Sequence, residues 1–342
     1  MARAAAHAAP QQAAWERPPP VLPLWAVMAV FWGAVSAVVL ARVLGAAENE
    51  AIGTFGVIFT SIVVEALPFI LIGATASAAI AVFVPARAFA RLAALPTPVQ
   101  VPAAAVAGFA MPVCECGSVP VARRLIMRGV HPSAGIAFML AAPILNPIVL
   151  ASTWVAYGSA GRALEMTAAR AALGLVVAVS AGVLIGRHGE SLVRSVAPAS
   201  HDHDHEHGRG SAAAFVEHLA SDFLFMGRFL VIGAAAAALL QTAVPQDWLA
   251  SVADREVLGA LALMGMAVAL SLCSEADAFV AVSFTAFPLG SQLAFLVVGP
   301  VFDAKLAVLY GAAFRRRFAL RVAAVAAPVA LAGALLFDRV VG

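Results

Sequence analysis

Apolar residues fill most of this chain in long stretches that short polar interruptions separate. A helix that crosses a bilayer needs about twenty consecutive apolar residues. The spacing of the interruptions therefore predicts an all-α polytopic membrane protein embedded in the lipid bilayer. The apolar segments run over 21–44, 51–84, 99–122, 131–157, 164–186, 216–244, 256–287, 290–313 and 317–337.

Composition supports this class. Of the 342 residues, 63% are hydrophobic and 12% are charged, whereas about 25% of the residues in a soluble domain are charged. No long basic run with interleaved aromatic residues is present, so nucleic acid is not expected as a partner. No P-loop, HExxH or nucleophile-elbow motif occurs either, so we predict neither an enzyme nor a bound cofactor.

Two of the apolar segments carry polar clusters in their interiors. The first, MPVCECGSVPV at 111–121, contains Pro112, Gly117 and Pro120, residue types that interrupt a helix. The second, SLCSEADAF at 271–279, contains two acids. Non-helical backbone at membrane depth is tolerated only where protein or a water-filled cavity surrounds it. We therefore expect broken helices or re-entrant hairpins near 112–120 and 272–280.

Four short matches recur in the same order along the chain. They pair PFILIGA with RFLVIGA, FVP with AVP, VCECGSVPV with LCSEADAFV, and APILNPIVL with GPVFDAKLA, at 68 and 228, 83 and 243, 113 and 272, and 142 and 299. The offset stays nearly constant, which indicates an internal duplication, as in many secondary transporters. The predicted organisation is a disordered tail at 1–20, a first transmembrane helix at 21–48, permease repeats at 49–194 and 215–342, and a His-rich linker at 195–214.

Arginines near the ends of the segments predict how the halves are oriented. Cytoplasmic loops of membrane proteins carry an excess of Lys and Arg. If both polar clusters enter the membrane and return, the arginines at 123, 124, 128, 187, 194 and 315–317 all lie on the cytoplasmic side. Each half then crosses three times, and the second half is inverted. This arrangement predicts the inner (plasma) membrane as the location and places the linker in the cytoplasm.

Thiols are the most distinctive chemical groups of the first cluster. Three cysteines are too few for a disulfide framework, and Cys114 and Cys116 are only two residues apart. Thiolates are soft donors that select copper(I), zinc and other thiophilic species. Cys114 and Cys116 are therefore candidate substrate ligands on a backbone shaped by Gly117 and Pro120, and Cys273 occupies the corresponding place in the second half. The alternative is that all three are small buried packing residues.

Several acids lie within apolar segments, where a charge is costly and marks a candidate functional site. A buried acid needs protonation, a cation or an arginine. Glu115 could carry a proton, pair with an arginine or lie at the cytoplasmic surface. The candidate ion-coupling residues are Glu115, Glu275, Asp277 and Asp303. Asp303 and Lys305 lie opposite Asn146 in the match between the halves and are candidate partners for the cluster at 271–279.

Two further motifs add candidate ligands. APILNP at 142–147 places Asn146 next to prolines, which suits either a cavity lining or a simple kink. HDHDHEH at 201–207 alternates His201, His203, His205 and His207 with acids. Imidazole and carboxylate are suitable zinc, nickel or copper(II) ligands. This linker is therefore a candidate metal-binding segment, or else an ordinary solvated connection.

The pattern made by Pro112, Cys114, Cys116, Gly117 and Pro120, together with APILNP, resembles a family of predicted permeases. This family includes the ArsP-type organoarsenical exporters and the YraQ-like membrane proteins. The resemblance covers most of residues 50–340 and implies efflux of trivalent methylated or aromatic arsenicals, with Cys114 and Cys116 as candidate ligands. The histidine linker is not part of that pattern.

Three functions are therefore weighed. The first is a secondary efflux permease for a trivalent organoarsenical or a soft metal. The second is a zinc-class divalent metal transporter or a metal-trafficking membrane subunit. The third is a membrane redox protein that uses the cysteine pair, although the usual C-x-x-C spacing is absent. A homo-oligomer or a partner membrane subunit fits either transporter.

Overall fold

A computed structural model describes residues 50–84, 94–111, 113–187, 212–243, 256–314 and 317–341. The predicted tail, the first predicted transmembrane helix and the His-rich linker at 201–207 lie outside these ranges. The described helices are α2 (Glu50–Phe83), α4 (Thr97–Ala107), η2 (Gly108–Ala110), α5 (Glu115–Met127), α6 (Pro132–Leu145), α7 (Pro147–Gly158), α8 (Ala163–Gly186), α9 (Ala212–Ala243), α10 (Glu256–Leu270), α11 (Asp277–Ala281), α12 (Leu289–Val298), α13 (Ala304–Ala313) and α14 (Phe318–Val341).

Helical spans of membrane length confirm the predicted class. Five described spans are long and apolar enough to cross a bilayer: Ile52–Ile80, Pro132–Gly158, Ala163–Gly186, Ala212–Thr242 and Phe318–Val341. Shorter apolar helices lie among them. The protein is therefore an all-α polytopic membrane protein.

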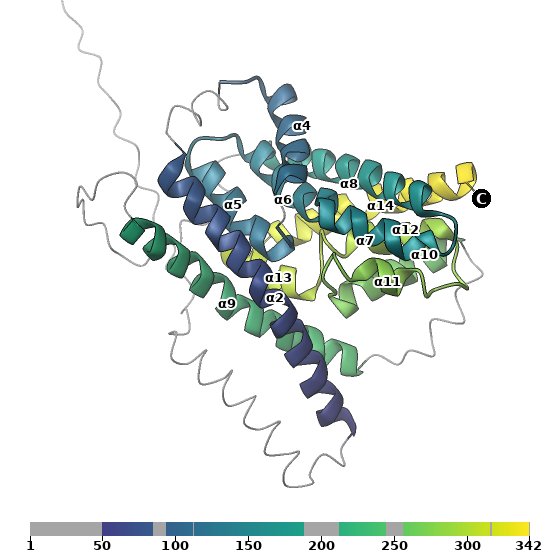
Figure 1. The fold of residues 1–342 in the computed structure, drawn as a ribbon. Helices are drawn as coiled ribbons and strands as arrows, with labels where there is room; N and C mark the ends of the chain where they lie inside the picture. The colour runs from purple at the N-terminus through teal and green to yellow at the C-terminus, as the bar shows by residue number, and fades with distance from the viewer. Residues whose placement is uncertain are drawn as a thin grey trace, which may run out of the picture.

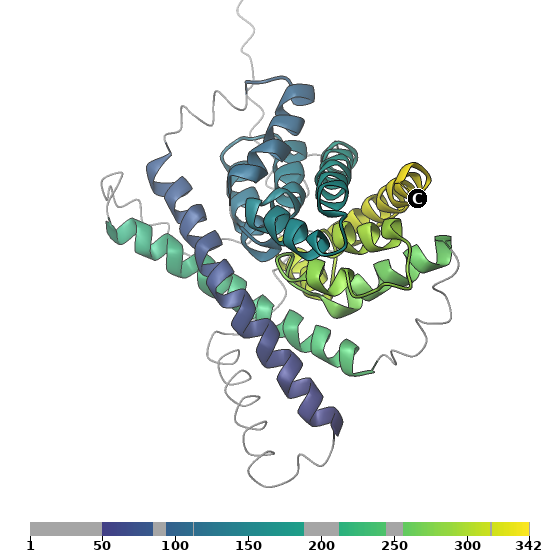
Figure 2. The same ribbon diagram turned by 45° about the vertical axis from the view of Figure 1, so that its right-hand side comes forward.

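The two longest helices cross each other. α2 has 34 residues and α9 has 32, and they run obliquely along one side of the remaining helices (Figures 1 and 2). Small and large side chains interlock at their contact, where Phe59 and Ile62 of α2 pack with Ala234 and Ala238 of α9. Alanines at this crossing let the helices approach closely.

Helix order repeats between the two halves. α2, α4, α5, α6, α7 and α8 are followed by α9 to α14. α4 packs on α6 as α10 packs on α12, and α6 packs on α8 as α12 packs on α14. α8 and α14 have 24 residues each and contact each other. This repeated order is what two related halves would give; the duplication and the inverted orientation stay predictions.

Both polar clusters coincide with helix breaks. In the first half the backbone is extended at Met111 and Cys114, and α5 begins at Glu115. In the second half α10 ends at Leu270 and α11 begins only at Asp277. Ser271 has a φ of 47°, a left-handed conformation that is uncommon for a residue other than glycine.

The first break is shorter than the sequence indicated. Gly117 and Pro120 lie inside α5, so the expectation that they unwind the chain is wrong, and Pro112 lies outside the described residues. Gly117 instead permits a close helix crossing. A Cβ added at Gly73 of α2 would overlap the Cα of Gly117, and one added at Gly117 would lie 3.1 Å from the Cα of Gly73.

A second pair of breaks uses polar caps. Asn146 ends α6 and caps α7, where its Oδ1 accepts a hydrogen bond from the Ile148 N–H at 2.9 Å. Asp303 caps α13 in the same way, because its Oδ1 accepts from the Leu306 N–H at 2.6 Å. Asn146 and Asp303 are the residues that the sequence match between the halves pairs, so the match has a structural counterpart.

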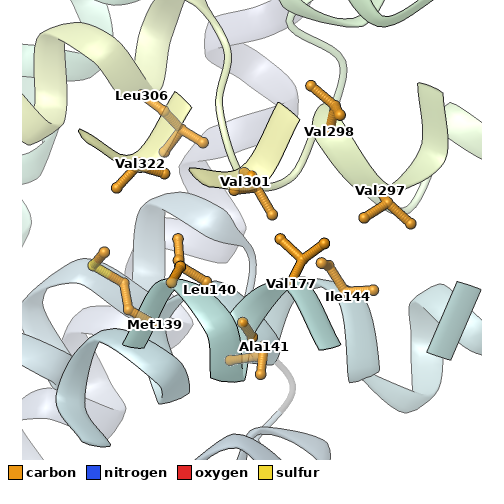
Figure 3. Packing of buried hydrophobic residues seen from close by; sticks show 14 of the residues in the cluster. Met139, Leu140, Ala141, Ile144, Val177, Val297, Val298, Val301, Leu306 and Val322 are labelled. Carbon is orange, nitrogen blue, oxygen red and sulfur yellow. The ribbon is translucent and has the colours of Figure 1, made fainter. Parts of the chain in front are cut away.

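Apolar side chains from both halves form one core. Figure 3 shows Met139, Leu140 and Ile144 of α6 with Val177 of α8, opposite residues of the second half. All of these side chains are buried. The halves therefore meet along a close-packed seam, and the broken segments lie beside it. The labelled residues of the second half are Val297, Val298, Val301, Leu306 and Val322.

Candidate functional site

An ion pair joins the two halves at the first helix break. Lys305 Nζ on α13 lies 2.7 Å from Glu115 Oε1 at the start of α5. Both side chains are at most 2% exposed. The Ser274 hydroxyl, from the break in the second half, donates to Glu115 Oε2 at 3.2 Å. Glu115 therefore lies in the protein interior and is paired with a lysine, a partner that the sequence did not predict for it.

Lys305 has further neighbours in the second half. Its ammonium lies 3.6 Å from Asp303 Oδ2, 3.5 Å from the Leu272 carbonyl oxygen and 3.9 Å from Cys273 Sγ. Asp303 is fully buried, and its Oδ2 makes no hydrogen bond among the described residues. The Lys305 ammonium is thus hydrogen-bonded to the Glu115 carboxylate and lies in a longer ionic contact with the Asp303 carboxylate.

All three thiols are free and buried. Cys114 caps α5 and Cys116 lies two residues further along, in its first turn, and Cys273 Sγ lies 3.9 Å from Lys305 Nζ. Cys116 and Lys305 line a cavity of about 10 Å³, room for about one water molecule. Its other walls are apolar: Ile70, Met226, Phe229, Leu230 and Leu309.

A second buried ion pair also joins the halves. Arg170 Nη1 and Nη2 on α8 donate to Asp277 Oδ1 and Oδ2 at 2.9 and 2.7 Å. The same guanidinium donates to Thr153 Oγ1 at 2.8 Å and to the Ser274 carbonyl oxygen at 3.3 Å. Arg170 is completely buried. Sequence reasoning missed this residue, although an isolated arginine within the apolar segment 164–186 was a usable signal.

Two of the candidate residues lie apart from these contacts. The two carboxylate oxygens of Glu275 are buried, and so is the Nδ2 atom of Asn146. Among the described residues, none of these three atoms has a hydrogen-bond partner. Asn146 contributes a cap to α7 and is joined to Lys305 by no hydrogen bond or ion pair in the described chain. Glu275 follows Ser274 and adds a third carboxylate near the Glu115–Lys305 pair.

Residues 51–338 match a family described as "Predicted permease" (ArsP_1). The chain belongs to this permease family. The permease is 40% identical over 282 residues to the UPF0718 protein YcgR of Bacillus subtilis, which covers 82% of this chain and 95% of that protein. It is 34% identical over 268 residues to a "Putative two-component membrane permease complex subunit" of Streptococcus mutans, covering 77% and 88% of the two chains. No solved structure matches it.

The permease therefore brings together part of the predicted set. Glu115, Cys116, Cys273 and Asp303 gather around Lys305, Cys114 is the residue before Glu115, and Asp277 is paired with Arg170. Gly117 and Pro120 belong to α5, and Asn146 caps α7. Among the described residues, no group of three or more His, Cys, Asp and Glu side chains is arranged to hold a metal ion. The four linker histidines lie outside those residues.

Proposed function

We propose that this permease is a secondary transporter that exports a thiophilic substrate, such as a trivalent organoarsenical or a soft metal, across the plasma membrane. The observation that carries the proposal is the position of Cys114 and Cys116. Both thiols are buried at a helix break between the two halves, and Cys116 lines a cavity there. Helix breaks at membrane depth are where transporter sites are usually found.

Thiols are well suited to such a substrate. Sulfur is a soft donor and binds arsenic(III) or a soft metal ion better than oxygen does. The two thiols lie two residues apart at the start of α5, and we propose that both reach one substrate atom. Cys273 Sγ lies 3.9 Å from Lys305 Nζ and supplies a third sulfur from the second half. A substrate held by thiols of both halves would respond to any relative movement of those halves.

Acids beside the thiols are the proposed coupling groups. In the described part of the site, Glu115, Glu275, Asp277 and Asp303 outnumber the cations Lys305 and Arg170. Surplus negative charge is costly in a low-dielectric interior and attracts protons or other cations. We propose that this surplus couples export to a proton or other ion gradient. Asp277 is held on both oxygens by Arg170, which favours the other acids for coupling.

The test replaces each thiol by serine. Cys114→Ser and Cys116→Ser keep the side-chain size and exchange a soft sulfur for a hard oxygen, so each should reduce transport of phenylarsine oxide at least about tenfold. The double variant should be little worse than either single variant, because residues that grip one ligand are non-additive. The measurement is uptake into everted membrane vesicles, normalised to the amount of protein on an immunoblot.

Structural cysteines would give a different result. Serine at a packing position would lower the melting temperature and the amount of inserted protein, with transport per molecule unchanged. Wild-type transport in the double variant would remove both thiols from the mechanism. The redox alternative is weakened by membership of a permease family, which favours a transporter over an enzyme.

A second candidate is a divalent-metal transporter or the membrane subunit of a metal-trafficking complex. Two observations favour it: the HDHDHEH motif and a relative whose name describes a permease complex subunit. Cells that express the wild type or a deletion of 201–207 would be grown on phenylarsine oxide, zinc, copper and cadmium. Protection against zinc alone, lost on deletion, would support this candidate over the first.

A further inference from the structure

Lys305 is a buried cation that lies within ion-pair distance of two carboxylates. Its ammonium forms the short contact to Glu115 Oε1 at 2.7 Å, and Asp303 Oδ2 lies 3.6 Å away. That oxygen is fully buried and accepts no hydrogen bond from any described residue. An acceptor of this kind stabilises a cation that moves toward it, because an unpaired buried carboxylate oxygen is costly.

Arg170 shows what a permanent ion pair looks like in the same protein. Its guanidinium contacts both oxygens of Asp277 and also donates to Thr153 and to the Ser274 carbonyl. Two parallel hydrogen bonds define one geometry. Lys305 instead makes one short contact through a flexible four-carbon chain, and it borders the cavity beside Cys116. Its surroundings therefore permit a displacement that those of Arg170 prevent.

We propose that the Lys305 ammonium exchanges between Glu115 and Asp303 during transport, and that the carboxylate it leaves takes up the coupling proton. The inference rests on one part of the proposed function, the coupling of transport to an ion gradient, and is independent of which substrate is transported. Lys305 keeps its three protons throughout. When it moves to Asp303, Glu115 binds one proton from water on the open side, and the return of Lys305 displaces that proton to the other side.

Groups from every neighbouring element bear on this exchange. α5 contributes Glu115 and Cys116, α2 contributes Glu65, and the break before α11 contributes Cys273 and Glu275. The part of α9 that lines the cavity is apolar. Lys305 is thus the one described cation within this acidic group, with Arg170 already held by Asp277. Its position decides which carboxylate is free to be protonated.

The first experiment measures stability and needs no substrate. Glu115→Gln and Asp303→Asn remove each charge with little change of shape, and asparagine still caps α13. Each single variant leaves Lys305 one carboxylate, so each should lower the melting temperature only slightly. The double variant leaves it neither, so its loss should exceed the sum of the single losses by about twofold or more. Asp277→Asn alone should lose nearly as much, because Arg170 is paired with no other carboxylate among the described residues.

The melting temperatures decide between exchange and a static pair. Additive losses, or a Glu115→Gln variant as unstable as the double variant, would overturn the proposal, since Asp303 would then not receive the ammonium. Glu165→Gln serves as the matched control. It removes an acid from the exposed ion pair with Arg162 and should leave the melting temperature unchanged.

The second experiment follows protons in proteoliposomes that enclose a pH-sensitive dye, with phenylarsine oxide as the probe. The wild type should move protons when the probe is added, and Asp303→Asn should exchange the probe without moving them. Proton movement equal to that of the wild type in Asp303→Asn would overturn the exchange. A wild type that moves neither protons nor probe would overturn the arsenical substrate of the proposed function, and the melting temperatures would then decide the exchange alone.

Discussion

Individual buried charges dominate the chemistry where the two halves of the permease meet. Glu115 with Lys305 and Asp277 with Arg170 each join one half to the other. A buried pair adds little net stability compared with apolar residues, but the loss of one partner leaves an uncompensated charge. These four side chains therefore constrain how the halves fit together more than they strengthen the fold.

Asp277→Asn should destabilise the protein strongly. The change leaves the fully buried Arg170 guanidinium without its counter-ion, at a cost of about 3–5 kcal/mol in the free energy of unfolding. Adding Arg170→Met removes that buried charge and should restore much of the loss. Thermal unfolding in detergent would measure both variants. A single variant as stable as the wild type would show that water or another acid compensates Arg170.

Helices of this permease approach one another through repeated glycines. Gly73 of α2 and Gly233 of α9 are the corresponding glycines of the PFILIGA and RFLVIGA matches. Gly73 lies against Gly117 of α5, and a Cβ at Gly233 would lie 2.8 Å from the Cα of Lys305. The duplicated motif thus brings a long helix close to the site-bearing helix in each half.

Alanine at either glycine should push these helices apart. Because the obstructing atoms belong to the backbone, Gly73→Ala and Gly233→Ala should each cost about 1–3 kcal/mol and lower transport. Gly53 on α2 and Gly227 on α9 provide matched controls, since nothing lies within 4 Å of a Cβ added there. Alanine at those positions should be neutral or slightly stabilising. Equal melting temperatures for the two pairs of variants would contradict the role of the close crossing.

Elements were easier to predict from the sequence than the contacts between them. Runs of apolar residues marked α2, α8, α9 and α14, and polar clusters marked both helix breaks. The pattern could not show that α5 begins at Glu115, because Pro120 lacks the N–H that would bond to the Cys116 carbonyl and so favoured a break at that point. A glutamate in the first turn, which complements the helix dipole, favours this start.

The ion pairs of the site could not be predicted from local sequence patterns. Glu115 and Lys305 are separated by 190 residues, and Arg170 and Asp277 by 107. Only the packing of the two halves brings these residues together. The sequence match pairs Asn146 with Asp303, and the two residues do have equivalent positions, because Asn146 caps α7 and Asp303 caps α13. The match did not show that the Lys305 ammonium lies beside Asp303 and not beside Asn146.

At the scale of the whole molecule, the repeated helix order predicts an inverted arrangement. Arg128 after α5 and Arg317 before α14 are exposed, and both should face the cytoplasm if each half crosses three times. Cysteines introduced at these positions should therefore react with an impermeant maleimide from the same side of the membrane. The native cysteines are buried and give a low background. Labelling from opposite sides would exclude the inverted repeat.

The lengths of α2 and α9 also tie the permease to the thickness of its bilayer. Helices of 34 and 32 residues extend about 50 Å, whereas the hydrocarbon core measures about 30 Å. Such helices adapt to this hydrophobic mismatch by tilting or by deforming the lipid around them. Because α2 and α9 cross and carry Gly73 and Gly233 against the central helices, a change of tilt would shift the walls around Lys305. Acyl-chain length would then act as a regulator of the buried charged centre.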